Sequence, residues 1–337
     1  MSTQAGGRLV RREGYRVIPD KNIYIPPSIS PEAKALLGAL GQAKTYAMEF
    51  PAPDDVVGWE KMYEVAEGAN KEKSEKALAA SGATVTELEM GGVVVEDIRP
   101  HGWTDNGKVL VYVHGGGYCL FSARSTFADA APMAAATGLR MVSVNYTPAP
   151  RARFDVIQRQ IVAVFDALID EGYRMSDLAI LGDSAGGAMS ASTVLNLRDQ
   201  GKGMPAAAVL WSPNTDLTSP DDSTVTLDPA DPILTYSTLL TTGAKAYAGD
   251  VALDDPRVSP LYADLSQGFS PVLIVVGTKE MLLSSSVRFY QALEAAGQTA
   301  KLDVYEGMWH VFPQYDLPES RVAVAKSAKF VTDHLNQ

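Results

Sequence analysis

Cysteine, histidine and positive charge are all scarce in this chain of 337 residues. Its one cysteine, Cys119, excludes a framework of internal disulfides and a multi-cysteine metal site. Acidic residues outnumber basic ones by 40 to 29, and the net charge of −11 argues against a nucleic-acid partner, whose binding proteins present a basic face. The four histidines show no metal-ligand spacing, so we expect neither a metal nor another cofactor.

Long hydrophobic runs are also missing. No apolar stretch approaches the ~18 residues that a membrane span needs, and the first twenty residues lack the apolar core of a secretory signal. We therefore expect a cytoplasmic protein without a membrane span. A hydrophobic content of 46% is ordinary for a globular protein, and the length suits either two domains or one large α/β domain.

Strands and helices alternate over most of the chain, which predicts an α/β fold with a mostly parallel central sheet and helices on both faces. Residues 84–90 and 93–100, separated by Gly91 and Gly92, are expected to form an antiparallel pair. Buried strands are expected at 109–113, 141–146, 178–181, 207–211, 272–276 and 302–305. The expected helices are one that Asp155 caps and Gly172 ends, one after Ser184, one over 285–296 and one over 322–335.

Two regions depart from this alternation. Residues 30–81 are helical in pattern, with a break at Pro51 and Pro53. About sixty residues within 212–270 are rich in Asp, Pro, Ser and Thr, and we expect an excursion with helix of its own because compact domains rarely carry so long a structureless loop. We therefore expect residues 1–82 to form an N-terminal helical cap region and 83–337 a catalytic core, with a further cap excursion within about 212–270.

A serine between glycines follows one of the expected strands directly. The pentapeptide GDSAG, residues 182–186, comes after the apolar stretch 178–181 and before a helix. In this context the serine sits on a sharp turn, and glycine two residues to either side lets the backbone pass closely. The motif predicts a nucleophile at Ser184, against the alternative of a glycine-rich helix start without chemistry.

A second glycine-rich motif, HGGGY at residues 114–118, ends the expected strand 109–113. Three consecutive glycines after a strand let backbone N–H groups turn toward one point, where they stabilise an oxyanion. The alternative is a phosphate-binding turn, but both nucleotide-binding glycine patterns are missing. Cys119, which follows this motif, is interpreted as a small packing residue.

The base and the acid are predicted by elimination and chain order. Of the four histidines, His310 alone lies in the loop after the last expected strand, because His334 falls on the expected terminal helix. Hydrolases with a Gly-x-Ser-x-Gly turn between a strand and a helix order their triad as serine, acid and histidine. Glu280 is the one carboxylate in the turn after strand 272–276, where it would orient the imidazole. The nearest competitor is Asp303, inside the strand before His310.

Together these motifs resemble the hormone-sensitive-lipase-like carboxylesterases, the bacterial family IV of the α/β-hydrolase superfamily. The resemblance covers residues 84–312 and rests on HGGGY, GDSAGG, RVSPLYADL, GTKEMLL and GMWHVF. It implies the α/β-hydrolase fold, with Ser184 as nucleophile and His310 as base. It also implies an oxyanion hole formed by the backbone N–H groups of Gly116, Gly117 and Ala185.

The chain departs from that family in two motifs. The family's usual acid is aspartate, whereas this chain has Glu280, one methylene longer. The family's Tyr-Arg-Leu-Ala-Pro-Glu segment reads YTPAPR at residues 146–151, which replaces both charged residues. The same triad role remains chemically available to a glutamate.

The sequence thus predicts a serine carboxylesterase that hydrolyses short-chain acyl esters through a Ser-His-Glu triad and an acyl-enzyme. A lactone hydrolase or an amidase would use the same triad, and a non-catalytic small-molecule receptor would share the fold with a broken one. The expected partner is a small-molecule ester, and relatives of this kind are often homodimers. Candidates for an apolar substrate pocket flank the motifs, namely Tyr118, Phe121, Trp211, Met281 and Trp309.

Overall fold

A central β-sheet organises the computed structural model, which describes residues 24–43, 50–218, 220–234 and 239–336. In these residues eight strands pair in the order β1-β2-β4-β3-β5-β6-β7-β8. The strands are β1 (Thr84–Met90), β2 (Val93–Arg99), β3 (Val109–Val113), β4 (Arg140–Val144), β5 (Leu178–Asp183), β6 (Ala207–Trp211), β7 (Val272–Gly277) and β8 (Ala300–Tyr305). β2 runs antiparallel to β1 and β4, and every other pairing is parallel. The α/β prediction is confirmed.

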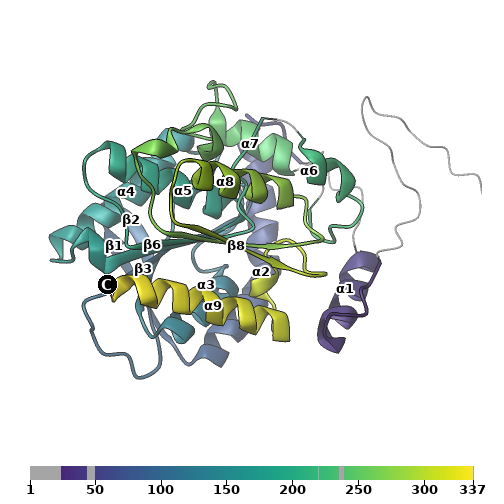
Figure 1. Ribbon diagram of the computed structural model, residues 1–337, viewed down its shortest axis with the longest axis horizontal. Helices are drawn as coiled ribbons and strands as arrows, with labels where there is room; N and C mark the ends of the chain where they lie inside the picture. The colour runs from purple at the N-terminus through teal and green to yellow at the C-terminus, as the bar shows by residue number, and fades with distance from the viewer. Residues whose placement is uncertain (1–23, 44–49, 219, 235–238, 337) are drawn as a thin grey trace, which may run out of the picture.

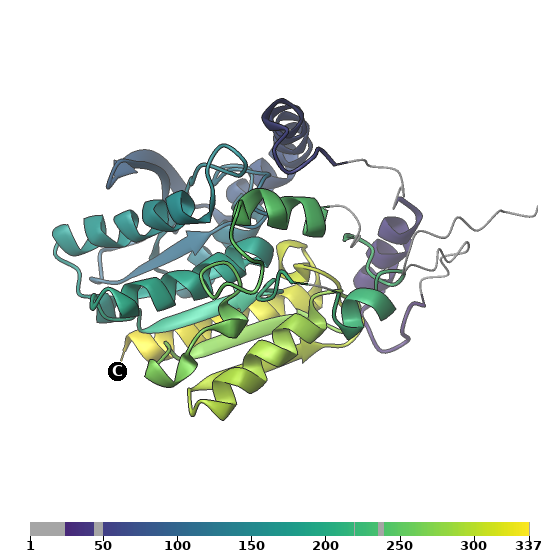
Figure 2. The ribbon, with the colours of Figure 1, turned by 90° about the horizontal axis from the view of Figure 1, so that it is seen from above.

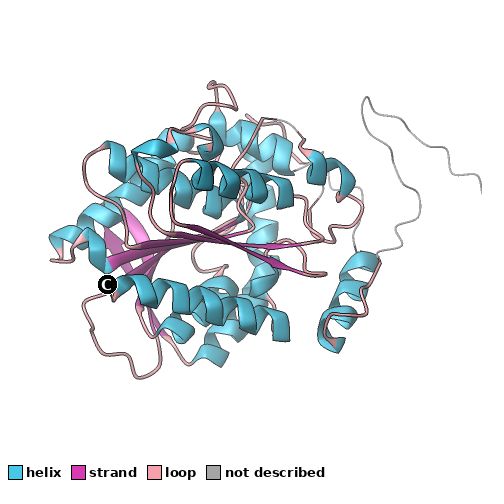
Figure 3. Cartoon of the chain, viewed as in Figure 1, coloured by secondary structure: helices cyan, strands magenta, loops and turns pink. Residues whose placement is uncertain are grey.

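Helices cover both faces of this sheet (Figures 1 and 3). One face carries α4 (Phe154–Asp170), α5 (Ser184–Asp199) and α8 (Leu283–Ala295). The other carries α3 (Phe127–Thr137) and α9 (Pro318–Leu335). Side chains of a strand alternate between its two faces, so a strand covered on both sides must be apolar throughout.

Strand β3 shows that alternation directly. Val109, Val111 and Val113 join the core cluster beneath α4, α5 and α8, whereas Leu110 and Tyr112 join the cluster beneath α3 and α9. All five residues of the strand are buried. The continuous apolar run read from the sequence therefore corresponds to a strand in the middle of the sheet.

Three details differ from the sequence-based expectations. Helix α3, with Pro132 inside it, was not predicted, because its run of alanines shows no distinct amphipathic period. Helix α4 begins two residues earlier than expected, at Phe154, with Arg153 rather than Asp155 at the N-cap. Asp155 lies in the first turn and pairs with Arg159 at 3.0 Å, which still suits a negative charge near a helix N-terminus. Strand β4 ends at Val144, two residues before the predicted boundary.

The N-terminal helices dock on the core at separate places. Helix α1 (Pro31–Ala43) lies against α9, and Ser30 Oγ donates to Glu319 Oε2 at 2.9 Å. Helix α2 (Val56–Ser81) packs along α3, where the Glu67 carboxylate accepts from the hydroxyls of Ser122 and Ser125. Polar contacts thus hold α2 against the segment that follows the HGGGY motif.

The excursion within 212–270 carries the short helices α6 (Asp222–Thr226) and α7 (Thr241–Ala248), so its predicted helical content is confirmed. Figures 1 and 2 place α1 and α6 toward the same end of the molecule. Among the described residues, no helix is both long enough and apolar enough to cross a bilayer.

Candidate active site

Ser184 occupies a tight turn between β5 and α5. Its φ of +52° lies in the left-handed region that few side-chain-bearing residues adopt. The turn also requires glycine, because a Cβ at Gly186 would collide with the carbonyl oxygen of Val113, and one at Gly182 with that of Gly186. The sequence Gly-x-Ser-x-Gly is therefore needed here for backbone approach, as the motif analysis predicted.

His310 and Glu280 lie beside this serine in a continuous chain of contacts. His310 Nε2 is 2.9 Å from Ser184 Oγ, and His310 Nδ1 is 3.1 Å from Glu280 Oε2. The other carboxylate oxygen of Glu280 accepts from the Gly277 N–H at 2.5 Å. Three residues spread over 126 positions of sequence are thus brought together at the carboxyl ends of β5, β7 and β8.

Asp303, the competing carboxylate, lies elsewhere. It accepts from the Tyr305 hydroxyl at 2.7 Å and pairs with Lys326 of α9 at 3.0 Å. It makes no contact with His310 in the described structure. Its position inside β8 therefore directs it to α9 and not to the edge of the sheet where His310 lies.

Burial raises the pKa of Glu280, whose side chain has no exposed surface. Hydrogen bonds from His310, from the Gly277 N–H and from the Ser212 hydroxyl act in the opposite direction. Ser212, with a φ of +49°, also accepts from the Val311 N–H at 3.0 Å and so ties the Glu280 turn to the His310 loop. Sequence reasoning missed this serine because no motif marks it.

Asp183, directly before Ser184, is a second buried carboxylate at the site. Its Oδ1 accepts from the Tyr112 hydroxyl at 2.6 Å and from the Gly115 N–H at 3.0 Å. Burial raises the pKa of Asp183, and these two hydrogen bonds lower it. The carboxylate therefore links the serine turn to the HGGGY turn, a role that nothing in the local sequence shows.

The HGGGY turn has glycine where its backbone needs it. Gly116 and Gly117 adopt φ of +106° and +58°. Among the described residues, the N–H groups of Gly116 and Gly117 in the turn and of Ala185 in the first turn of α5 donate to no protein acceptor. For Ala185 this follows from its place, because the first N–H groups of a helix have no intrahelical partner.

His114, the first residue of that turn, is held as a neutral imidazole. It is fully buried, stacks on Tyr146 with ring centroids 4.2 Å apart, and its Nδ1 lies 2.8 Å from the Gly115 carbonyl oxygen. Burial lowers the pKa of His114 to about 4. It therefore serves as structure and not as a second base.

Two predicted pocket residues are wrong. Trp211 is fully buried on the α9 face of the sheet, where its Nε1 donates to Ser327 Oγ at 3.1 Å. Trp309 is equally buried and meets Tyr315 edge to face at 5.6 Å. Both belong to the core cluster beneath α3 and α9, because strand alternation and the loop path turn them away from the sheet edge.

The remaining pocket candidates lie near the site but are mostly buried. Tyr118 stacks on Tyr247 of α7 at 4.2 Å, and half-buried Phe121 lies against Gly116. Met281 packs with Leu234 and Leu282. Contact between a substrate and Tyr118, Phe121 or Met281 stays a prediction.

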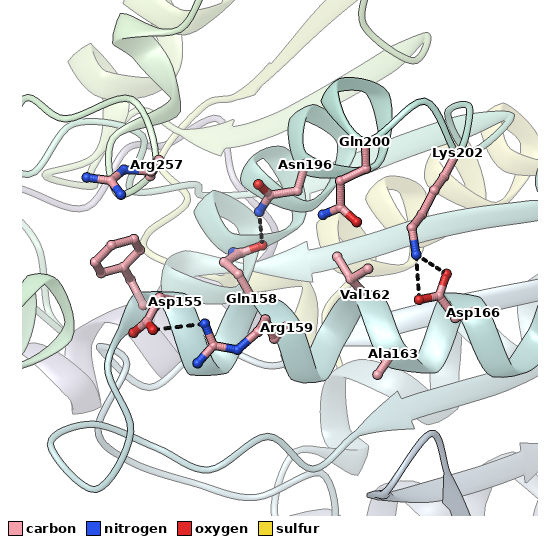
Figure 4. A pocket seen from close by; sticks show the side chains of 11 residues that line it. Asp155, Gln158, Arg159, Val162, Ala163, Asp166, Asn196, Gln200, Lys202 and Arg257 are labelled. Carbon is pink, nitrogen blue, oxygen red and sulfur yellow. Dashed lines mark hydrogen bonds and ion pairs between the residues drawn. The ribbon is translucent and has the colours of Figure 1, made fainter.

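A groove of about 410 Å³ between α4 and α5 lies apart from these residues (Figure 4). Four of its charged side chains pair with each other, Arg159 with Asp155 at 3.0 Å and Lys202 with Asp166 at 2.5 Å, and Arg257 pairs with Asp255 outside the groove. None of the predicted site residues lines it. The groove therefore adds no group to the serine site.

The sequence matches a family model described as alpha/beta hydrolase fold over residues 110–314. An esterase of Acinetobacter venetianus is 33% identical over 248 residues, covering 73% of this chain and 80% of the relative. An acetyl-hydrolase of Streptomyces hygroscopicus is 31% identical over 246 residues, covering 72% of this chain and 81% of the relative.

Solved structures agree with these relatives. An esterase of the bacterial hormone-sensitive lipase family aligns with a TM-score of 0.80 at 30% identity, over 91% of this chain and 99% of that one. The esterase EstE5, soaked with p-nitrophenyl butyrate, aligns with a TM-score of 0.82 at 28% identity, over 91% and 100% of the two chains. The chain is a carboxylic ester hydrolase that belongs to the α/β-hydrolase family, among its hormone-sensitive-lipase-like carboxylesterases.

Proposed function

We propose that this hydrolase cleaves short-chain acyl esters through Ser184, His310 and Glu280. The observation that carries the proposal is the pair of contacts that joins them, 2.9 Å from Ser184 Oγ to His310 Nε2 and 3.1 Å from His310 Nδ1 to Glu280 Oε2. A hydroxyl, an imidazole and a carboxylate in this order form an activated nucleophile.

The reaction proceeds in two steps. His310 takes the proton of Ser184 as the oxygen attacks the ester carbonyl, and then gives that proton to the departing alcohol. The acyl group remains on Ser184 until water, deprotonated by His310, attacks it and releases the acid. Throughout, Glu280 orients the imidazole and stabilises the imidazolium that forms twice in each cycle.

The oxyanion of each tetrahedral intermediate is assigned to the backbone N–H groups of Gly116, Gly117 and Ala185. Such donors act where charge develops, and each is worth roughly 10²–10³-fold in kcat. The dipole of α5, which begins at Ser184, adds positive potential at the same point.

A short acyl group suits the covered site. Ser184 and His310 are 6% and 4% exposed, and the side chain of Leu239 packs against Gly117. We assign α1, α2 and the excursion within 212–270 to a cap that selects a small-molecule ester. One relative is an acetyl-hydrolase and one structural neighbour is an esterase soaked with p-nitrophenyl butyrate, and both support the same substrate class.

The nucleophile is tested by Ser184→Ala with p-nitrophenyl butyrate as substrate. We expect kcat to fall by at least ~10³-fold with the circular dichroism spectrum and melting temperature retained, because only the attacking oxygen is lost. Hydrolysis near the wild-type rate by this variant would contradict the assignment of Ser184 as the nucleophile.

The substrate class is tested with p-nitrophenyl esters from acetate to laurate and with a lactone. We expect kcat/KM to be greatest for acyl chains of four carbons or fewer and to fall toward laurate. Covalent labelling by a fluorophosphonate separates an enzyme from a receptor on the same fold, because only an activated serine reacts. A preference for laurate or for the lactone would overturn the short-chain assignment.

A further inference from the structure

Helix α7 lies directly on the oxyanion turn, and a glycine makes this possible. A Cβ at Gly243 would collide with the carbonyl oxygen of Gly117. From the other side of the contact, a Cβ at Gly117 would lie 2.7 Å from Leu239 Cδ1. The backbone of α7 at Gly243 therefore lies against the Gly117 carbonyl, and the Leu239 side chain occupies the space beside Gly117.

Two neighbouring contacts hold α7 in this place. Tyr247, one turn after Gly243, stacks on Tyr118 with ring centroids 4.2 Å apart and is itself fully buried. Phe154 meets the same ring edge to face at 6.3 Å. Because Tyr118 follows Gly117 in the chain, both ends of the Gly117–Tyr118 segment are covered by one short helix.

Glycine is costly within a helix of eight residues. It destabilises a helix interior by roughly 1 kcal/mol relative to alanine. Gly243 is buried within α7, so its presence is explained by the contact with Gly117 and not by exposure or by a left-handed φ.

We propose that α7 forms the outer wall of the oxyanion hole and that Gly243 is a positioning residue for the Gly117 N–H. The inference rests on the proposed function, because it assigns a task to an oxyanion donor. The contact holds the Gly117 carbonyl and thereby fixes the peptide unit before it, whose N–H faces the developing charge. Gly117 itself cannot resist displacement, because glycine has the widest choice of backbone conformations.

The test is Gly243→Ala, with Gly68→Ala as the matched control. Both replace a helical glycine by a better helix former, but a Cβ at Gly68 in α2 meets nothing within 4 Å. We expect Gly243→Ala to lower kcat for p-nitrophenyl butyrate by roughly 10–100-fold with KM within about threefold, since part of one oxyanion donor is lost. Gly68→Ala should raise the melting temperature slightly, and so measures the gain in helix propensity without a collision.

A transition-state analogue separates positioning from general damage. A trifluoromethyl ketone adds to the serine to form a tetrahedral oxyanion, so its inhibition constant should rise by the same factor as kcat/KM falls. Leu239→Ala offers a second variant without a collision. It loosens the same contact, and we expect a loss in kcat/KM of roughly 3–10-fold with the same parallel rise in the inhibition constant.

The outcomes are distinct. An unchanged kcat/KM in both Gly243→Ala and Leu239→Ala overturns the inference, as does a loss of activity while the ketone still binds with wild-type affinity. If Gly243→Ala does not fold, the decision rests on Leu239→Ala alone. A wild-type protein that neither hydrolyses the ester nor reacts with a fluorophosphonate would instead contradict the proposed function.

Discussion

Two buried carboxylates flank Ser184, and they differ in what faces them. Glu280 lies on the imidazole side, where its oxygens meet His310 Nδ1 and the Gly277 N–H. Asp183 lies on the side of the oxyanion turn, where one oxygen accepts from the Tyr112 hydroxyl and the Gly115 N–H. Burial raises the pKa of both groups.

Similar burial can therefore accompany separate tasks. In the proposed mechanism Glu280 faces a group that gains and loses a proton during each turnover, so its charge acts on the transition state. Asp183 accepts from a hydroxyl and a backbone amide whose protonation does not change, so its main proposed task is to hold the geometry, beside a longer-range charge interaction with His310. A carboxylate's partner, more than its depth in the protein, decides which kind of contribution it makes.

Removing the charge of Glu280 should have the larger effect. In Glu280→Gln we expect kcat for p-nitrophenyl butyrate to fall by about 10³-fold or more, because the amide neither stabilises the imidazolium nor holds the required tautomer. Steady-state kinetics measure this loss. Asp303→Asn is the control and should retain activity within about twofold, since Asp303 contacts Tyr305 and Lys326 instead. A crippled Asp303→Asn would reverse the assignment of the acid.

Removing the charge of Asp183 should have an intermediate effect. Asp183→Asn keeps an oxygen that accepts from the Tyr112 hydroxyl. Its hydrogen bond from the Gly115 N–H becomes weaker, because a charged acceptor makes the stronger hydrogen bond. We expect kcat to fall by roughly 10–100-fold, through the oxyanion turn. The loss should appear equally in the affinity for a trifluoromethyl ketone. Equal losses of kcat in Asp183→Asn and Glu280→Gln would contradict the proposal that the two carboxylates have different roles.

The smallest effect concerns stability, where the two carboxylates should behave alike. A raised pKa means that the native state binds the proton more tightly than the unfolded chain does. The free energy of unfolding therefore falls as pH rises from the ordinary carboxyl pKa through the raised one. The neutral variants Glu280→Gln and Asp183→Asn lack this titration, so each should gain stability relative to the wild type over the pH range from the ordinary carboxyl pKa, about 4, up to the raised one.

Urea unfolding at several pH values within that range measures this difference. Ser184→Ala is the control, because it removes no titratable carboxylate and its difference from the wild type should stay constant with pH. A difference that shrinks as pH rises would contradict the raised pKa of the carboxylate concerned.

The strands and the two glycine turns were predictable because their causes are local. The run 109–113 is apolar at every position, and its burial on both faces follows from that. The glycines around Ser184 are required by a collision within one turn, which a five-residue motif can encode. Chain order then led to His310 and Glu280, whose side chains the fold brings within hydrogen-bonding distance of each other.

Predictions failed where a residue's surroundings come from distant segments. Trp211 flanks the motifs in sequence, yet the phase of β6 turns its ring toward Ser327 on α9. Asp155 resembled a helix cap, but α4 begins at Phe154 with Arg153 at its N-cap. No local signal marks Ser212 or Gly243, because their partners lie about 100 residues or more away in Val311 and Gly117.

Local patterns were enough to predict the α/β architecture and the serine turn, because periodicity and short glycine motifs act over a few residues. The hydrogen bond from the Gly115 N–H to Asp183, the place of both tryptophans in the core and the position of α7 on Gly117 follow only from the folded structure. Those features depend on which side chains meet across the sheet edge. Contacts between distant segments form only when the whole core packs, so no local pattern encodes them.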